Sequence, residues 1–393
     1  MEIPSFALTR LPKIAFGQGV INELPIHIAH YGKRVLLVTG ARSFRQTPHW
    51  PALLDGLRNQ GAVVETLTIT GEPSPYEVDE AVRTYRETGI DVVVGIGGGS
   101  VLDAAKAIAG LLAYGNSVMD HLEGVGKGIL YRGPATPFIA VPTTAGTGSE
   151  ATKNAVLSVQ GVDGFKKSFR HDALIAHVAI IDPTLLKSCP PALIAANGMD
   201  ALTQLLESYV SVRANPLTDA LALSGLRAVR DGLFAAWRGG DGVEADRGRA
   251  CMAYGSLLSG ISLAQAGLGS VHGLASPLGA YFPIAHGVVC GTLVAAATQV
   301  NIQALSERAI HSPALGKYAH VSALLNEGQA ESKPLWEILQ AWTDQLGILR
   351  LGHYGVNETN IEKIVANARG GSMQTNPIVL TDEEIATVVR ARL

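Results

Sequence analysis

The sequence contains few cysteines and few charged residues, and each shortage excludes a class of protein. Three cysteines occur among 393 residues, without the paired spacing of metal-binding or disulfide-rich chains. Cys189, Cys251 and Cys290 are therefore expected to be buried apolar residues without a functional role. Charged residues make up 17% of the chain and hydrophobic residues 47%. This composition indicates a globular protein, large enough for two domains with buried cores.

Basic residues are neither in excess nor clustered. The 31 lysines and arginines face 34 acidic residues, which gives a net charge of -3. A chain without a basic patch lacks the electrostatic means to bind a nucleic-acid backbone or an anionic membrane surface. The expected partner is therefore a small molecule.

Long uninterrupted hydrophobic runs are also missing. The stretch from Leu257 to Val300 is unusually apolar, but polar residues and prolines interrupt it before the roughly 18 residues that a membrane span needs. We expect this stretch to form a buried core around a site. Met1 to Pro4 show no basic start or apolar segment of a signal peptide, so a cytoplasmic location is expected.

The pattern of the chain changes near residue 188. Before it, short β-rich runs alternate with helical patterns, which predicts an α/β domain over residues 1–187 with a mostly parallel sheet. After it, the sequence predicts an all-helical domain over residues 188–393, starting at Ser188-Cys189-Pro190-Pro191. The active site is expected at strand carboxyl ends and in the crevice between the domains. The expected strands are Val35–Thr39, Ala62–Ile69, Asp91–Ile96, Phe138–Val141 and Val178–Ile181.

Three consecutive glycines, Gly97 to Gly99, follow a buried strand and precede a helix. Backbone N–H groups and the positive helix end can there approach a pyrophosphate without obstruction by side chains. The loop matches neither the common dinucleotide-binding spacing nor a P-loop, so a kinase or ATPase is disfavoured. The alternative is a tight turn that needs glycine conformations.

A second loop, Thr143 to Glu150, also follows an apolar strand and contains both hydroxyls and glycines. Such a loop is suited to hydrogen bonds with a ribose, a phosphate or a nicotinamide amide. Two loops of this kind after two strands favour a bound nucleotide over simple turns.

A possible metal site involves Asp200, Gln204, His272 and His286. Asp200 and Gln204 are four residues apart and share one face of a predicted helix. The two histidines are fourteen residues apart, about 21 Å along a continuous helix, so they can share an ion only if the chain reverses. Pro277, Gly279 and Pro283 make such a reversal plausible. The alternative is two buried, hydrogen-bonded core histidines.

Taken together, these segments resemble the iron-containing (group III) alcohol dehydrogenase family. The resemblance implies an N-terminal dinucleotide-binding domain, a C-terminal helical domain of dehydroquinate synthase-like architecture, and hydride transfer between NAD(P) and an alcohol or aldehyde carbon. It rests on Ile14 to Gly17, Gly97 to Lys106, Thr143 to Glu150, Asp182-Pro183, Gly198 to Ala201, His286-Gly287 and Thr375 to Pro377, which occur in the family's order.

The resemblance also implies roles for single residues. Asp200, His272 and His286 would be catalytic and, with Gln204, would hold Fe²⁺ or Zn²⁺ to polarise the substrate oxygen. A lysine before Asp182, Lys166 or alternatively Lys167, would contact the nicotinamide ribose, unless both are surface lysines. The remaining cofactor-binding residues would be Gly97, Gly98, Gly99, Ser100, Asp103, Thr143, Thr144 and Thr147.

The residue after the first expected strand bears on cofactor choice. The family often has an aspartate there, which binds the adenosine ribose and repels a 2′-phosphate, whereas this chain has Gly40. Ser43 and either Arg42 or Arg45 could then bind the phosphate. We therefore predict NADP(H) as the preferred cofactor, with NAD(H) as the alternative if Gly40 is only a turn residue.

Two positions depart from the family pattern: Gln204 replaces a metal-binding histidine, and Ser276 replaces a histidine near the nicotinamide. A carboxamide oxygen suits hard cations better than Fe²⁺ or Zn²⁺. Serine cannot act as an acid or base near neutral pH. The main prediction is a metal-assisted dehydrogenase for short or medium alcohols and aldehydes, expected to be a homodimer.

Three other functions remain open at this point. The first is a metal-independent reductase of the maleylacetate reductase type, which Gln204 and Ser276 favour and Asp200 disfavours. The second is a lyase similar to dehydroquinate synthase, for which the sequence has no added basic cluster. The third is a cofactor-binding protein without catalysis.

Overall fold

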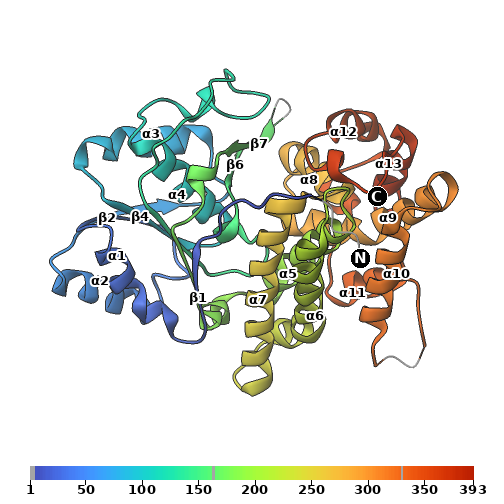
Figure 1. Ribbon diagram of the computed structural model, residues 1–393, viewed down its shortest axis with the longest axis horizontal. Coiled ribbons are helices and arrows are strands. Elements are labelled where there is room, and N and C mark those ends of the chain that lie inside the picture. The colour runs from blue at the N-terminus through green and yellow to red at the C-terminus, as the bar shows by residue number, and fades with distance from the viewer. Residues whose placement is uncertain (1–4, 162–163, 329–330) are drawn as a thin grey trace. The chain divides into compact units, whose positions relative to one another are not determined.

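The computed structural model describes residues 5–161, 164–328 and 331–393, and within them the chain forms two compact units (Figure 1). One unit, the sheet unit, comprises Thr9–Val159 and Lys166–Cys189. The other, the helical unit, comprises Pro190–Leu393 and the described residues of 1–8 and 160–165. The boundary predicted between residues 187 and 188 lies next to this division, whereas the sequence did not indicate that two earlier segments join the helical unit.

The sheet unit is built on six parallel strands in the order β1-β8-β5-β4-β2-β3. This confirms the predicted α/β class with a parallel sheet. All five predicted strands are present, and β1, which the strand pattern did not indicate, pairs with β8. The strands are β1 (Lys13–Phe16), β2 (Arg34–Gly40), β3 (Val63–Ile69), β4 (Val92–Gly97), β5 (Phe138–Pro142) and β8 (Val178–Ile181).

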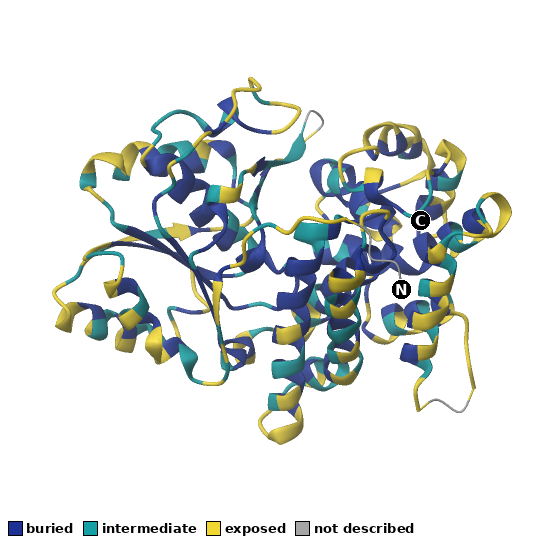
Figure 2. Cartoon of the chain, in the orientation of Figure 1, coloured by how far each residue is buried: buried dark blue, intermediate teal, exposed yellow. Residues whose placement is uncertain are grey.

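The central strands are buried along their whole length, as expected for a parallel sheet covered on both faces. Every residue of β4 and β5 is buried, and Figure 2 shows the strands of this sheet mostly in the colour of buried residues. Val, Ile and Leu supply most of this core. The helices of this unit are α1 (Leu24–Ala29), α2 (His49–Asn59), α3 (Pro75–Tyr85) and α4 (Gly99–Leu112).

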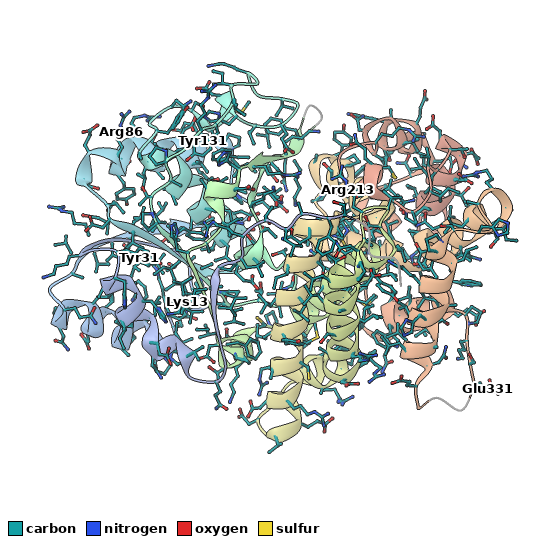
Figure 3. The ribbon with its side chains drawn as sticks, in the orientation of Figure 1. Lys13, Tyr31, Arg86, Tyr131, Arg213 and Glu331 are labelled. Carbon is teal, nitrogen blue, oxygen red and sulfur yellow. The ribbon has the colours of Figure 1, made fainter. Side chains whose placement is uncertain are left out.

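A separate two-stranded sheet pairs β6 (Asn154–Val159) with β7 (Phe165–Arg170). The sequence did not predict these strands, because β7 is mostly polar and partly exposed. Tyr131, labelled in Figure 3, packs its ring against Phe169 of β7. Its Oη donates a hydrogen bond of 2.6 Å to the carbonyl oxygen of Gly110 in α4.

The helical unit contains no strand apart from Phe165 of β7 among its described residues, which confirms the predicted all-helical second half. Its first helix starts at Pro191 with Pro190 as cap, as the Pro-Pro pair predicted. The helices are α5 (Pro191–Val210), α6 (Pro216–Arg238), α7 (Val243–Ala266), α8 (Ser270–Tyr281), α9 (His286–Arg308), α10 (Pro313–Asn326), α11 (Leu335–Gln345), α12 (Ile361–Asn367) and α13 (Asp382–Arg390).

Among the described residues, one helix is long and apolar enough to cross a membrane. This helix is α9, and 72% of its most apolar window is buried inside the structure. Such burial is typical of a core helix, because a membrane span presents its apolar side chains to lipid.

The chain reverses between α8 and α9, which a metal site shared by His272 and His286 would require. The break lies at residues 282–285, around Pro283, whereas Pro277 stays inside α8. After the break, α9 packs closely against α5: a Cβ on Gly287 would lie 2.5 Å from the backbone oxygen of Ala196. A glycine at this position therefore allows the backbones of α5 and α9 to approach.

Candidate active site

The two loops predicted to bind a nucleotide lie against each other at the carboxyl ends of β4 and β5. A Cβ on Gly98 would lie 3.2 Å from Thr144 Oγ1, and one on Gly99 would lie 2.9 Å from Thr147 Oγ1. The backbone N–H of Thr143 also donates to the carbonyl of Gly97 over 2.9 Å. Larger side chains in the glycine loop would therefore push the threonines away.

The glycine loop ends in the first turn of α4, which has Gly98 as its cap. The first N–H groups of a helix have no partner within the helix and carry its positive end, which is a ready-made site for a phosphate. Gly98, Gly99 and Ser100 are partly exposed, as are Thr144 and Thr147. We name the surface formed by these five residues the glycine–threonine cradle.

Asp103 lies one turn further along α4, and its carboxylate is engaged inside the protein. Its Oδ1 accepts a hydrogen bond from Ser149 Oγ at 2.6 Å, and its Oδ2 accepts one from the Val156 amide at 3.1 Å. The fully buried Lys106 donates to the carbonyl of Ser149 at 2.8 Å and lies 3.7 Å from Asp103. The structure therefore places Asp103 where it ties α4 to the loop behind the cradle.

Lys166 is not a solvated surface lysine. Its ammonium forms an ion pair with Glu72, a residue that follows β3, and its side chain is 12% exposed. Ser158 of β6 donates to the same carboxylate. Glu72 was not predicted from the sequence, because its position beside Lys166 depends on how β7 folds back.

The end of β2 has space for a Cβ at Gly40. A Cβ on Gly40 would meet only Ser43 Oγ and a Val101 methyl group, both at 4.0 Å. Arg42 and Ser43 are exposed, whereas Arg45 donates to Thr39 Oγ1 at 2.8 Å and stacks over Trp50. Both arginines thus lie within five residues of the strand end.

In the helical unit, Asp200, His272, His286 and Cys290 come together. One ligand atom from each of them lies within 4.8 Å of all the others. His272 Nε2 is 3.2 Å and His286 Nε2 is 3.7 Å from Asp200 Oδ1. Residues separated by more than 70 positions thus meet where α5, α8 and α9 pack together, as the predicted metal site required.

Glu207 fixes the orientation of His272. Its Oε2 accepts the Nδ1–H of His272 at 2.6 Å, and its Oε1 accepts the amide of Val271 at 2.7 Å. Asn376 accepts the neighbouring amide of Ser270 at 3.0 Å, so two side chains satisfy the start of α8. With Nδ1 committed to Glu207, the lone pair of Nε2 faces Asp200 and can bind a cation.

Gln204 lies beside this cluster on α5. Its Nε2 donates to Asp200 Oδ1 at 3.3 Å, and its Oε1 accepts a hydrogen bond from Ser259 Oγ at 2.8 Å. The structure therefore brings Gln204 to the predicted site, but turns its amide nitrogen rather than its oxygen toward Asp200.

Burial and neighbouring groups shift the pKa values of Asp200, His272 and Cys290. Burial opposes ionisation of Asp200, but His286, together with hydrogen bonds from His272 and Cys290, lowers its pKa. Burial also disfavours the charged form of His272, yet Cys290, Asp200 and Glu207 raise its pKa well above the ordinary value. Burial raises the pKa of the Cys290 thiol to about 12. Positive charge is thus favoured at the centre of the cluster.

The residues present fit a divalent metal ion. Asp200 Oδ2 is buried without a hydrogen-bond partner among the described residues, and a bound cation would offset the cost of burying this carboxylate oxygen. Carboxylate, imidazole and thiol are the donors that bind Zn²⁺ or Fe²⁺.

Two residues of this cluster, Glu207 and Cys290, were not predicted from the sequence to have a role. Each lies one or two helical turns from a predicted ligand, Glu207 after Asp200 and Cys290 after His286. A search for polar residues at such spacings on a helix would have found both.

Comparison with known proteins now identifies the family. A family model described as iron-containing alcohol dehydrogenase matches residues 12–183, and its C-terminal counterpart matches residues 194–393. The chain belongs to the iron-containing alcohol dehydrogenase family. It is thus an NAD(P)-dependent oxidoreductase that acts on CH–OH groups, as the resemblance implied.

Individual relatives of this family cover nearly the whole chain. A long-chain-alcohol dehydrogenase of Geobacillus thermodenitrificans is 35% identical over 95% of this chain and 93% of its own length. An NAD-dependent methanol dehydrogenase of Bacillus methanolicus is 31% identical over 97% of this chain and 98% of its own. A crystal structure of 1,3-propanediol oxidoreductase is 30% identical, with a TM-score of 0.86 over 99% of this chain and 100% of its own.

Replacing Glu207 by glutamine should weaken metal binding by this dehydrogenase. The amide keeps one acceptor for two donors, and it removes the negative charge that makes His272 a stronger ligand. Loss of such an outer partner typically costs 10–100-fold in metal affinity. Competition with a chromophoric chelator measures the Zn²⁺ dissociation constant, with Glu244→Gln, an exposed site on α7, as the control. Equal affinity in both variants would contradict the role given to Glu207.

Proposed function

We propose that this protein is a metal-assisted, NADP(H)-dependent dehydrogenase that reduces short or medium aldehydes and oxidises the corresponding alcohols. The observation that carries the proposal is the cluster of ligand atoms around Asp200, all within 4.8 Å of one another. Asp200, His272 and His286 are the catalytic and metal-binding residues of this proposal, and Gln204 is in contact with Asp200.

Asp200, His272 and His286 would hold a divalent ion, which would supply a positive charge to polarise the substrate oxygen. The side chains around this centre are already arranged to stabilise a positive charge. Asp200 contributes a buried carboxylate, and Glu207 holds His272 with Nε2 directed at the centre. Because these groups are fixed before the substrate binds, little reorganisation accompanies the reaction.

The glycine–threonine cradle supports the proposed cofactor site. Its glycines leave the N-terminal amides of α4 accessible, and a pyrophosphate there would interact with the positive end of a fourteen-residue helix. In this proposal Thr143, Thr144 and Thr147 contact the nucleotide, Lys166 contacts the nicotinamide ribose, and Asp103 acts indirectly by holding the cradle loops together.

The proposed preference for NADP(H) rests on the end of β2. Gly40 carries no charge, and the exposed Ser43 and Arg42, or Arg45 behind them, provide donors for a 2′-phosphate. One relative is named as NAD-dependent, so NAD(H) remains the alternative cofactor. The protein is further proposed to be cytoplasmic, because its three cysteines are free, as is usual in a reducing compartment. It is also proposed to be a homodimer, the commonest kind of soluble oligomer.

Metal removal tests the proposed function directly. The metal-stripped protein should not oxidise NADPH with a panel of short and medium aldehydes, and anaerobic addition of Fe²⁺ or Zn²⁺ should restore turnover. Because a Lewis acid contributes several kcal/mol, the expected difference is about a hundredfold or more. Full turnover without metal would instead support a reductase of the maleylacetate reductase type.

Replacing Gly40 by aspartate tests the cofactor preference. The Cβ of the new side chain has no neighbour closer than 4.0 Å, and we expect its charge to repel the 2′-phosphate and to favour the ribose hydroxyls of NADH. Like charges in a partly solvated site cost on the order of 1 kcal/mol or more, so the KM for NADPH should rise about tenfold. Gly40→Ala, which adds volume without charge, should retain the NADPH preference. An unchanged KM in the aspartate variant would refute the argument.

A further inference from the structure

Gln204 and Cys290 are the two candidates for the fourth protein ligand of the proposed metal site. Both ends of the Gln204 amide are engaged, with Nε2 on Asp200 and Oε1 on Ser259. Turning the amide over would place its oxygen against the Asp200 carboxylate, where two acceptors repel each other. An amide nitrogen does not bind a metal, so the hydrogen bonds of Gln204 favour a role as a donor that orients Asp200.

Cys290 faces the same centre from the opposite helix. It lies one turn after His286 on α9 and is completely buried. Its Sγ lies 3.6 Å from His272 Nε2 and 3.8 Å from His286 Nε2. The thiol is therefore within reach of both imidazoles that are proposed as ligands.

These separations match a tetrahedral zinc site. With bond lengths of about 2.0–2.1 Å for nitrogen or oxygen and about 2.3 Å for sulfur, two ligand atoms lie about 3.3 Å apart, or about 3.6 Å apart when one is sulfur. The distance from Asp200 Oδ1 to His272 Nε2 is 3.2 Å and to His286 Nε2 3.7 Å, and the two sulfur–nitrogen distances are 3.6 and 3.8 Å. All ligand-atom pairs lie within 4.8 Å, so the four groups would have to move closer together to complete the tetrahedron.

We propose that the Cys290 thiolate is the fourth protein ligand of this metal centre, and that Gln204 supports Asp200 without binding the metal. The inference rests on the proposed metal-assisted function and deepens it. Binding exchanges the thiol proton, which leaves to solvent, for a sulfur–metal bond, and no group is oxidised or reduced. Two anionic ligands balance a divalent ion, and the soft sulfur favours Zn²⁺ over Fe²⁺.

Cobalt substitution reads out the sulfur ligand independently of activity. The full-length protein loaded with Co²⁺ should show a thiolate-to-cobalt charge-transfer band in the near ultraviolet, together with visible ligand-field bands of tetrahedral cobalt. Cys290→Ala should lose the charge-transfer band and bind cobalt at least tenfold more weakly. The control is Cys251→Ala on α7, a partly exposed cysteine outside the cluster, which should keep both band sets.

A double variant distinguishes the loss of a ligand in Cys290→Ala from a folding defect. Adding Gln204→His offers an imidazole from the adjacent helix turn, so cobalt affinity should recover at least tenfold, without the charge-transfer band. Recovery shows that the single variant lacked a ligand rather than a fold. An unchanged charge-transfer band in Cys290→Ala would overturn the assignment.

The spectra also separate this inference from the proposed function. Ligand-field bands without a charge-transfer band in the unmodified protein would overturn the sulfur ligand, but would leave the metal-assisted function intact. A folded protein that binds no cobalt would overturn both. A charge-transfer band that disappears only when Cys290 is replaced supports both.

Discussion

Two buried carboxylates on one helix, Asp200 and Glu207, hold the imidazole of His272 between them, and the site depends on this arrangement. Each carboxylate is less than a tenth exposed, and a buried negative charge is costly without a compensating positive one. Here the compensation comes from His272, whose pKa is raised well above its ordinary value, or from a metal ion that takes the place of its proton. The fold therefore provides a place for positive charge, which an alcohol dehydrogenase needs beside the substrate oxygen.

Small residues make this arrangement possible. Gly287 lets α9 approach α5, and Gly269 leaves space for Glu207 and Asn376, since a Cβ there would lie within 2.9 Å of both side chains. Glycines also allow close packing in the sheet unit, where Gly98 and Gly99 face threonines that a larger residue would displace. In both units, glycines set the distance between backbone and ligand-binding groups.

Much of the fold could be predicted from the sequence, because buried parallel strands and long helices leave simple periodic patterns. The β6–β7 pair could not, since a partly exposed polar strand such as β7 has no such pattern. Asp200, His272 and His286 were predicted as ligands of one metal ion, and the structure brings them together. Glu207 and Cys290 were not predicted, although each lies at a helical spacing from a predicted ligand, because only the packing of α5, α8 and α9 brings them to Asp200 and His272. The assignment of Asp103 to the cofactor site comes from the motif and stays a prediction; in the structure its carboxylate accepts hydrogen bonds from Ser149 and Val156.

The central claim is that the cluster around Asp200 is a metal centre, and metal content measures this most directly. The protein is loaded with Zn²⁺, passed through a desalting column and analysed by plasma mass spectrometry beside Asp200→Asn, with circular dichroism to confirm that both are folded. The account predicts about one zinc ion per chain in the unmodified protein and little retained zinc in the variant, since Asp200 is the buried carboxylate ligand. Equal zinc in both proteins, or no zinc in the folded unmodified protein, would contradict the account.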